Sequence, residues 1–212
     1  MKLNMPYNIH KHQFRKGALI KIINIIKKQE TSKKNQVLFF GDSLIEGIPQ
    51  NYPVTINGIS GISSEVMEHL LDELVVKFQP SHVFYHIGTN DLGGTTMKSP
   101  RDIAWSITRI MLILEQCLPD TKFYVISTLP CIDDLESYKA TGKGIRSNDL
   151  VTILNKEIQE HIVHTKAQFI DLNKHMTNND GSVKKEFYTD GLHITEEAYH
   201  YLADIIKSMN IL

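Results

Sequence analysis

The sequence predicts an α/β fold of three layers, α/β/α, around a five-stranded parallel sheet. Two observations lead to this class. Short apolar segments alternate with segments of helical periodicity, as in parallel sheets covered by helices on both faces. The short segments are apolar throughout, as in strands buried on both sides. A chain of 212 residues is also long enough for one domain with a substantial core. Five strands suit the flavodoxin-like order 2-1-3-4-5.

The strands are expected where Val, Ile, Phe and Tyr gather, and the helices where apolar residues recur every three or four positions. The predicted strands are residues 36–40, 54–57, 82–87, 122–127 and 168–171. The helical stripes are Val66, Leu70, Leu74 and Phe78; Ile103, Ile107, Ile110, Met111 and Leu114; Leu150, Leu154, Ile158 and Ile162; and Ala198, Leu202, Ile205 and Ile206. The long connection 129–147 is expected to be a mobile surface loop.

The N-terminal segment differs in charge from the rest. Residues 1–34 hold nine Lys and Arg against one acid, Glu30, while the whole chain has a net charge of −1. We therefore divide the chain into a basic helix and linker, 1–35, and one domain, 36–212. A solubilising role for the basic segment is favoured over contact with an acidic partner or a membrane surface. The overall charge gives no case for nucleic-acid binding, and a homodimer stays open.

The apolar stretch 18–26 resembles neither a secretion signal nor a membrane span. Lys21 and Asn24 interrupt it, and charged residues follow it instead of a small-residue cleavage site. Leu19, Ile22, Ile23 and Ile26 fall on one helical face, and no segment reaches the ~20 apolar residues that a span requires. We expect a cytoplasmic protein without stable membrane insertion.

Cysteine and histidine usage favours neither a disulfide framework nor a metal site. Cys117 ends an apolar helical pattern and is expected in the core, whereas Cys131 follows a strand, where exposure stays open. His82 and His86 alternate on a strand, but no other ligands follow at metal-binding spacing. No metal and no cofactor is expected.

Ser43, Asp190 and His193 together have the residue types of a serine nucleophile, an orienting acid and a base. Ser43 follows the first strand, at the edge of the sheet where ligands bind in parallel α/β folds. Asp190 and His193 are three residues apart, so one turn can bring the carboxylate to Nδ1 and leave Nε2 for Ser43. Taken alone, Ser43 is equally typical of a helix N-cap.

Two further segments can supply hydrogen bonds to a developing oxyanion. Asn90 follows the third strand, and its side-chain amide is a neutral donor. Asp91, beside it, is expected to brace the loop. Gly61 and Gly58 follow the second strand, and either backbone could approach a ligand closely.

The segments 41–44, 57–61, 88–91 and 190–193 resemble, in this order, the four blocks of the SGNH hydrolases, also called GDSL-type esterases and lipases. The resemblance covers residue 36 to the C-terminus and is strongest to the bacterial branch similar to the platelet-activating-factor acetylhydrolase alpha subunits. It implies Ser43, Asp190 and His193 as the catalytic triad. It also implies an oxyanion hole of Ser43, Gly61 and Asn90, with Gly61 preferred to Gly58.

The resemblance implies a carboxylic-ester hydrolase that uses an acyl-enzyme and acts on small-molecule esters with short, acetyl-type acyl groups. A lysophospholipase or thioesterase for longer acyl groups, and a non-catalytic binding protein on the same fold, are the alternatives. Arg146, Lys143 and the segment 92–94 flank the predicted site. They are solvated loop residues or contacts for a polar head group.

Overall fold

Five parallel strands form one sheet in the order β2-β1-β3-β4-β5. They belong to a computed structural model that describes residues 15–93, 96–133 and 145–211. The strands are β1 (Val37–Gly41), β2 (Thr55–Gly58), β3 (His82–His86), β4 (Lys122–Ile126) and β5 (Gln168–Ile170). The predicted class and strand order are confirmed, and each strand lies within two residues of its expected limits.

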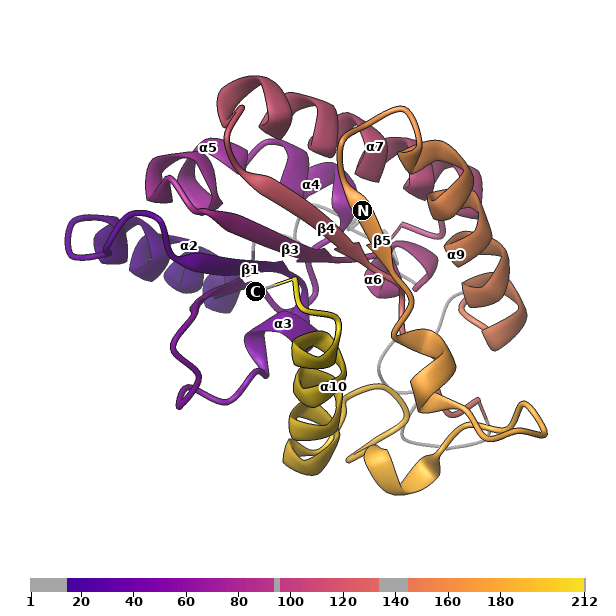
Figure 1. Cartoon of the computed structure of the whole chain (residues 1–212). Coiled ribbons are helices and arrows are strands. Elements are labelled where there is room, and N and C mark those ends of the chain that lie inside the picture. Colours follow the sequence, from indigo (N-terminus) through magenta and orange to yellow (C-terminus); the bar gives the residue numbers. More distant parts are fainter. Residues whose placement is uncertain (1–14, 94–95, 134–144, 212) are drawn as a thin grey trace, which may run out of the picture.

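Helices cover both faces of the sheet (Figure 1). The α-helices are α2 (Lys16–Gln29), α3 (Ser43–Glu46), α4 (Ser64–Glu68), α5 (Leu71–Leu74), α6 (Thr89–Leu92), α7 (Pro100–Cys117), α9 (Asn148–Ile162) and α10 (Glu196–Ser208). Short 3₁₀ turns are η1 (Val76–Phe78), η2 (Asn173–Met176) and η3 (Lys185–Phe187). Apolar residues of α2, α4, α5, α7 and α9 pack on one face, and those of α3 and α10 pack on the other.

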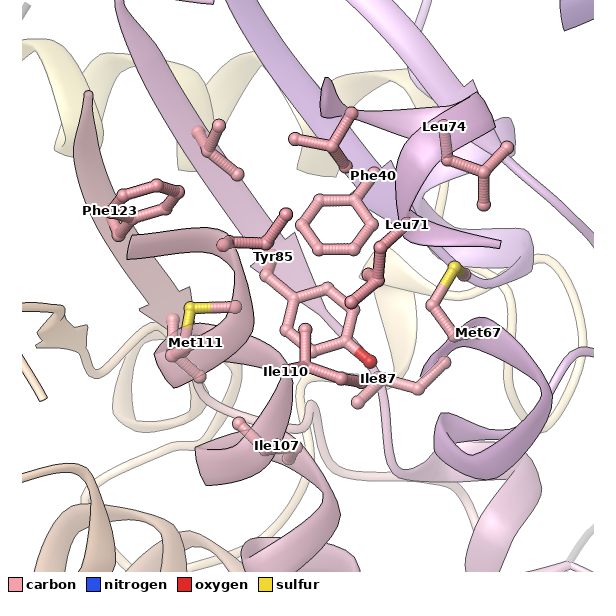
Figure 2. Close-up of a cluster of buried hydrophobic side chains, with 14 of the residues drawn as sticks. Phe40, Met67, Leu71, Leu74, Tyr85, Ile87, Ile107, Ile110, Met111 and Phe123 are labelled. Carbon is pink, nitrogen blue, oxygen red and sulfur yellow. The ribbon is translucent and has the colours of Figure 1, made fainter. Parts of the chain in front are cut away.

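The two cores rest on aromatic side chains that alternate along β1 and β3. Phe40 stacks on Tyr85 with ring centroids 4.2 Å apart, and this pair lies in the first core, among α4, α5 and α7 (Figure 2). Phe39 stacks on Phe84 at 4.6 Å on the opposite face, towards α10. Successive residues of a strand point to opposite faces, so each Phe-Phe or Phe-Tyr dipeptide contributes to both cores.

Three helices begin at hydroxyl caps that the sequence places next to their apolar stripes. Ser99 accepts a hydrogen bond from the Asp102 N–H, Ser147 from Leu150 and Thr195 from Ala198. Each cap satisfies a backbone donor that the helix leaves unpaired, which fixes where the helix starts.

The stripe from Val66 to Phe78 is not one helix. It is divided into α4, α5 and η1. Leu70 separates α4 from α5 at φ −114° and ψ 8°, Val75 separates α5 from η1 at φ −133°, and Gln79 ends η1 in a left-handed φ of 46°. Two successive β-branched residues, Val75 and Val76, weaken helix propensity at the second break. Leu74 and Phe78 are buried, and Val66 and Leu70 are partly buried against the first core. The pattern thus indicated the inward-facing residues correctly and the helix length wrongly.

The expectation for Cys117 is wrong, and the open question for Cys131 is answered by burial. Cys117 is exposed at the end of α7, because Leu118 takes the next buried position. Cys131 is buried with Leu192. The first residues of the 129–147 connection, Leu129 to Ile132, are likewise buried, whereas 134–144 lie outside the described residues.

The helix α2 packs on the first core through a different face from the expected one. Ala18 and Ile25 are buried and Ile22 packs beside them, whereas Leu19, Ile23 and Ile26 are exposed. The spacing 18, 22, 25 is equally helical, so periodicity alone left the choice of face open. The division of the chain at residue 35 stays a prediction. Within the described ranges, no helix has the length and apolar character to cross a membrane.

Candidate active site

Ser43 is the first residue of α3, directly after β1, and is half-buried. Asp42 caps this helix, accepting a hydrogen bond from the Leu44 N–H at 3.0 Å, and its Oδ1 lies 3.3 Å from His86 Nδ1. Asp42 is fully buried, and it ties the short helix to the end of β3. The serine is therefore held on a turn whose position depends on two strands.

Two glycines allow α3 to sit this close to the sheet. A Cβ on Gly41, whose φ is +154°, would lie 2.0 Å from the His86 carbonyl oxygen. A Cβ on Gly58, at the end of β2, would lie 2.1 Å from the Glu46 nitrogen. Both contacts are with backbone atoms, so any larger residue would displace α3 and Ser43 with it.

His193 and Asp190 meet Ser43 from the loop before α10. His193 Nε2 lies 3.0 Å from Ser43 Oγ, and His193 Nδ1 lies 2.8 Å from Asp190 Oδ2. Asp190 Oδ1 accepts hydrogen bonds from the N–H groups of Leu192 and His193, both at 2.7 Å. The three residues that the sequence selected thus form one hydrogen-bonded series across the carboxyl edge of the sheet.

The environment of Asp190 keeps its carboxylate ionised. Burial alone would raise the pKa of Asp190, but hydrogen bonds from the His193 side chain and from the His193 and Leu192 N–H groups outweigh it, and the pKa lies below its ordinary value. Each of these bonds favours the charged form. A charged acceptor at Nδ1 directs the imidazole proton to that nitrogen and leaves Nε2 facing the serine as an acceptor.

The loop that carries Asp190 and His193 is braced by the chain after β4. The Gly191 carbonyl accepts a hydrogen bond from the Ile132 N–H at 2.9 Å, and Leu192 packs on Cys131. Sequence reasoning missed this brace, because the apolar residues of the long connection carried no periodic pattern.

The segments after β2 and β3 lie side by side next to the series. The Asn90 amide Nδ2 donates to the Ile62 carbonyl at 3.0 Å, and an amide NH₂ has a second hydrogen for another acceptor. Gly61, one residue before Ile62, has a φ of +77°, which glycine adopts without strain. The Asn90 side chain therefore contacts the residue that follows Gly61, although 29 positions separate Asn90 from Gly61 in the chain.

A second acid that the sequence did not single out holds the same loop. Glu46, in α3, accepts hydrogen bonds from the Ser60 N–H at 2.7 Å and the Ser60 hydroxyl at 2.6 Å. Lys21 of α2 pairs with Glu46 at 3.3 Å. Burial raises the pKa of Glu46, but the Ser60 bonds and Lys21 outweigh it and lower the net value. No local signal distinguishes Glu46 from an ordinary surface acid.

The remaining predicted site residues are only partly placed. Arg146 is buried, next to Ile145, whose N–H donates to the Leu92 carbonyl at 3.1 Å. It is therefore not a solvated loop residue. Lys143 and Gly94 lie outside the described residues. Among the residues that the structure describes, no three His, Cys, Asp or Glu side chains gather as metal ligands would.

An apolar cavity of about 200 Å³ lies between the sheet and α10, behind α3. Leu44, Leu129 and Ile194 line it at the end nearest the site, and Leu202 and Ile206 line it from α10. Neither Ser43 nor His193 belongs to its lining, so the cavity adjoins the hydrogen-bonded series without containing it.

The fold belongs to the parallel α/β class, and the site holds a hydrogen-bonded serine, histidine and aspartate at the carboxyl edge of the sheet. A model of the GDSL-like lipase/acylhydrolase family matches residues 39–201, and the chain belongs to this family. The predicted resemblance is thereby confirmed.

Solved structures are similar to this chain in fold. A Streptococcus pneumonia protein described as a candidate platelet activating factor is 25% identical, with a TM-score of 0.82 over 92% of each chain. A GDSL-like lipase from Bacteroides thetaiotaomicron is 19% identical, with a TM-score of 0.75 over 89% of this chain and 96% of that one. A carbohydrate acetylesterase from Sinorhizobium meliloti is 18% identical, with a TM-score of 0.61 over 83% of this chain and all of that one.

Among curated proteins, an N-acylneuraminate cytidylyltransferase from Escherichia coli O18:K1:H7 is 27% identical over 191 residues. The match covers 85% of this chain but 42% of that protein. The chain thus spans less than half the length of this relative.

Proposed function

We propose that the chain hydrolyses short-chain, acetyl-type esters through a covalent acyl-enzyme on Ser43. The observation that carries the proposal is the hydrogen-bonded series from Ser43 Oγ through His193 to Asp190, with distances of 3.0 and 2.8 Å. These contacts are within the reach that a nucleophile and its base require, and the base is oriented by a third group.

In this mechanism His193 Nε2 takes the proton of Ser43 as the hydroxyl oxygen attacks the ester carbonyl. Asp190 holds the ring and stabilises the imidazolium. His193 then gives the proton to the leaving alcohol. Water attacks the acyl-enzyme by the reverse path and releases the acid and free Ser43.

The tetrahedral oxyanion would be held by three donors, the N–H groups of Ser43 and Gly61 and the Asn90 amide. The Asn90–Ile62 hydrogen bond supports this role, because it orients the amide beside Gly61 and leaves one N–H unused by that bond. Donors fixed before the reaction stabilise the developing charge without having to reorganise.

We propose O-acetylated sugars as the first substrate class to test. One relative in fold is a carbohydrate acetylesterase, and the name of the curated relative refers to an acylated sugar. The first name supports a sugar ester and the second supports a sugar as the molecule that carries it; a preference for long acyl groups is the competing outcome.

A fluorophosphonate probe tests the nucleophile. We expect labelling of the wild type at Ser43, none in Ser43→Ala, and full labelling in Ser182→Ala, which removes an exposed serine on a different loop. Labelling that persists in Ser43→Ala would refute the assignment.

A substrate panel tests the acyl group. Hydrolysis of p-nitrophenyl esters from acetate to palmitate, beside O-acetyl sugars, should give the highest kcat/KM for acetyl compounds. A maximum of kcat/KM at long acyl chains would refute the acetyl-ester preference and indicate a lipase or thioesterase activity instead.

A further inference from the structure

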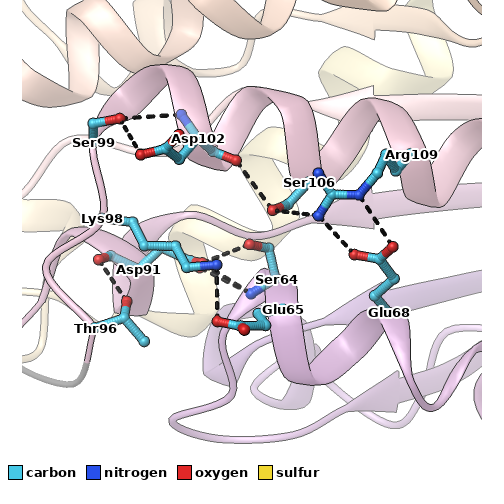
Figure 3. Close-up of polar contacts among 10 residues, drawn as sticks. All are labelled: Ser64, Glu65, Glu68, Asp91, Thr96, Lys98, Ser99, Asp102, Ser106 and Arg109. Atoms are coloured by element: carbon cyan, nitrogen blue, oxygen red, sulfur yellow. Dashed lines mark hydrogen bonds and ion pairs between the residues drawn. The ribbon is translucent and has the colours of Figure 1, made fainter.

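Asp91 is a fully buried acid one residue after Asn90, and its carboxylate accepts hydrogen bonds from Ser64. The Ser64 N–H approaches Oδ1 at 3.0 Å and Oδ2 at 3.1 Å, and the Ser64 hydroxyl donates to Oδ1 at 2.6 Å (Figure 3). Ser64 is the first residue of α4 and lies three positions after Gly61.

Consecutive residues of α6 therefore hold the loop after β2 at two points. Asn90 contacts the Ile62 carbonyl, and Asp91 contacts Ser64. The Asp91 backbone is itself fixed, because its carbonyl accepts a hydrogen bond from the Thr96 hydroxyl at 2.8 Å (Figure 3). It also accepts one from the Lys98 N–H at 2.9 Å. The two members of each bonded pair belong to different segments, one after β2 and one after β3. The covalent chain therefore does not set the distance between these two segments.

We propose that Asp91 is a positioning residue that fixes the spacing between the Gly61 N–H and the Asn90 amide by holding Ser64. The inference rests on the proposed function, because it requires these two groups to serve one oxyanion. A donor is effective only at about 2.7–3.1 Å from the position that the oxyanion will occupy. A displacement of about 1 Å in a catalytic group can cost ~10²-fold in rate.

The charge around Asp91 shows that its burial is costly. Burial raises the pKa of Asp91 to about 6, against the Ser64 hydrogen bonds and Lys98, which lower it, and with Asp42, which raises it further. Tyr85 also faces the carboxylate, and burial, followed by this charge, raises the pKa of its hydroxyl. Lys98, whose charge acts on Asp91, forms its ion pair with Glu65 at 2.9 Å. An apolar side chain would fill the space at lower cost but could not accept the Ser64 bonds.

The test compares Asp91→Ala with Asp91→Asn on p-nitrophenyl acetate. Asp91→Ala should lower kcat about 10- to 100-fold with KM within twofold, because the donors act on the tetrahedral state. Asp91→Asn should recover most of kcat, because its carbonyl can still accept both bonds that converge on Oδ1. An alkylboronic acid, which forms a tetrahedral adduct with a serine nucleophile, should bind Asp91→Ala about 10- to 100-fold more weakly. Binding of the product acid should not change.

Asp102→Ala is the matched control. Asp102 also contacts a serine at a helix start, with the Ser99 hydroxyl at 2.6 Å, but no proposed oxyanion donor lies beside it (Figure 3). The Asp102→Ala variant should leave kcat unchanged. If Asp91→Ala does not fold, Ser64→Ala, which removes only the hydroxyl bond, should lower kcat about threefold or more at constant KM.

The proposal is overturned if folded Asp91→Ala keeps wild-type kcat, or if Ser64→Ala does so when Asp91→Ala cannot be obtained. It is also overturned if Asp91→Asn loses as much kcat as Asp91→Ala, since the charge would then be needed in itself. Ser43→Ala separates the two levels of the argument. Turnover retained in Ser43→Ala would refute the proposed function, whereas an inactive Ser43→Ala beside a fully active Asp91→Ala would refute the positioning role alone.

Discussion

Replacing Asp91 with asparagine removes an ionisable group that the fold buries completely, and this should change how stability depends on pH. Asp91 has an ordinary pKa of 3.8 and a pKa of about 6 in the folded protein, with burial as the largest cause. A raised pKa means that the folded state binds the proton more tightly than the unfolded state. The stabilising contribution of the protonated group is therefore complete below about pH 3.8 and is lost as the pH rises through about 6.

The magnitude follows from the same two values. A shift of about 2 pKa units corresponds to about 3 kcal/mol of stabilisation of the folded state, and this stabilisation is fully lost above pH 6. Roughly half of this loss falls between pH 5 and pH 8, about 1.4 kcal/mol or a factor of ten in the unfolding equilibrium. Asparagine does not titrate, so the free energy of unfolding of Asp91→Asn relative to the wild type should increase by this amount from pH 5 to pH 8.

Urea unfolding at constant ionic strength, followed by circular dichroism at pH 5, 6, 7 and 8, measures the difference directly. Asp120→Asn, which changes an exposed aspartate, is the control and should give a difference that stays constant with pH. Comparing each variant with the wild type at the same pH cancels the titration of every other carboxyl group. A constant difference for Asp91→Asn, or one that decreases towards pH 8, would refute the reasoning.

Three further variants test the site. Asn90→Ala should lower kcat by about 10²–10³-fold with little change in KM, because the amide is proposed to act on the tetrahedral state; steady-state kinetics would contradict this if KM rose at constant kcat. Asp190→Asn should lower kcat by about 10³–10⁴-fold, because an amide no longer selects the His193 tautomer; retention of a tenth of the wild-type kcat would oppose the role. Gly58→Ala should cost about 1–3 kcal/mol in denaturant unfolding, because its Cβ meets the Glu46 nitrogen at 2.1 Å, and should slow fluorophosphonate labelling of Ser43; wild-type stability and labelling would show that α3 adapts.

The sheet was predictable because its signals are local. Each strand is an apolar run whose neighbours are helices with their own periodic stripes, and parallel strands all end at the same edge. Side chains that follow β1, β2 and β3, such as Ser43 and Asn90, must therefore gather there whatever the details of the loops. The same reasoning does not apply where periodicity is ambiguous, as in α2, whose buried face is Ala18 and Ile25 and not Leu19 and Ile23.

Asp91 was expected to brace its loop, but the partners that brace the site were not predictable, because they are ordinary residue types distant in sequence. The acids and serines of these pairs, Glu46 with Ser60 and Asp91 with Ser64, are residue types that are common on exposed turns. Their type alone therefore does not mark a brace. Their partners depend on the course of loops without regular structure. Cys131 shows the same limit: its burial follows from the packing of the connection after β4 on the loop of His193, which no pattern within either segment encodes.

The position of these braces follows from what the loop after β2 lacks. Residues 59–63 form neither helix nor strand, and Gly61 is in a left-handed conformation that glycine can readily leave. A backbone N–H that must already face an oxyanion before the reaction cannot depend on such a segment alone. Here side chains supply the rigidity: Glu46 holds Ser60 on one side of Gly61, and Asn90 and Asp91 hold Ile62 and Ser64 on the other. In the proposed oxyanion hole, the flexibility of Gly61 and the Ser64 hydrogen bonds that Asp91 accepts are thus two parts of one requirement.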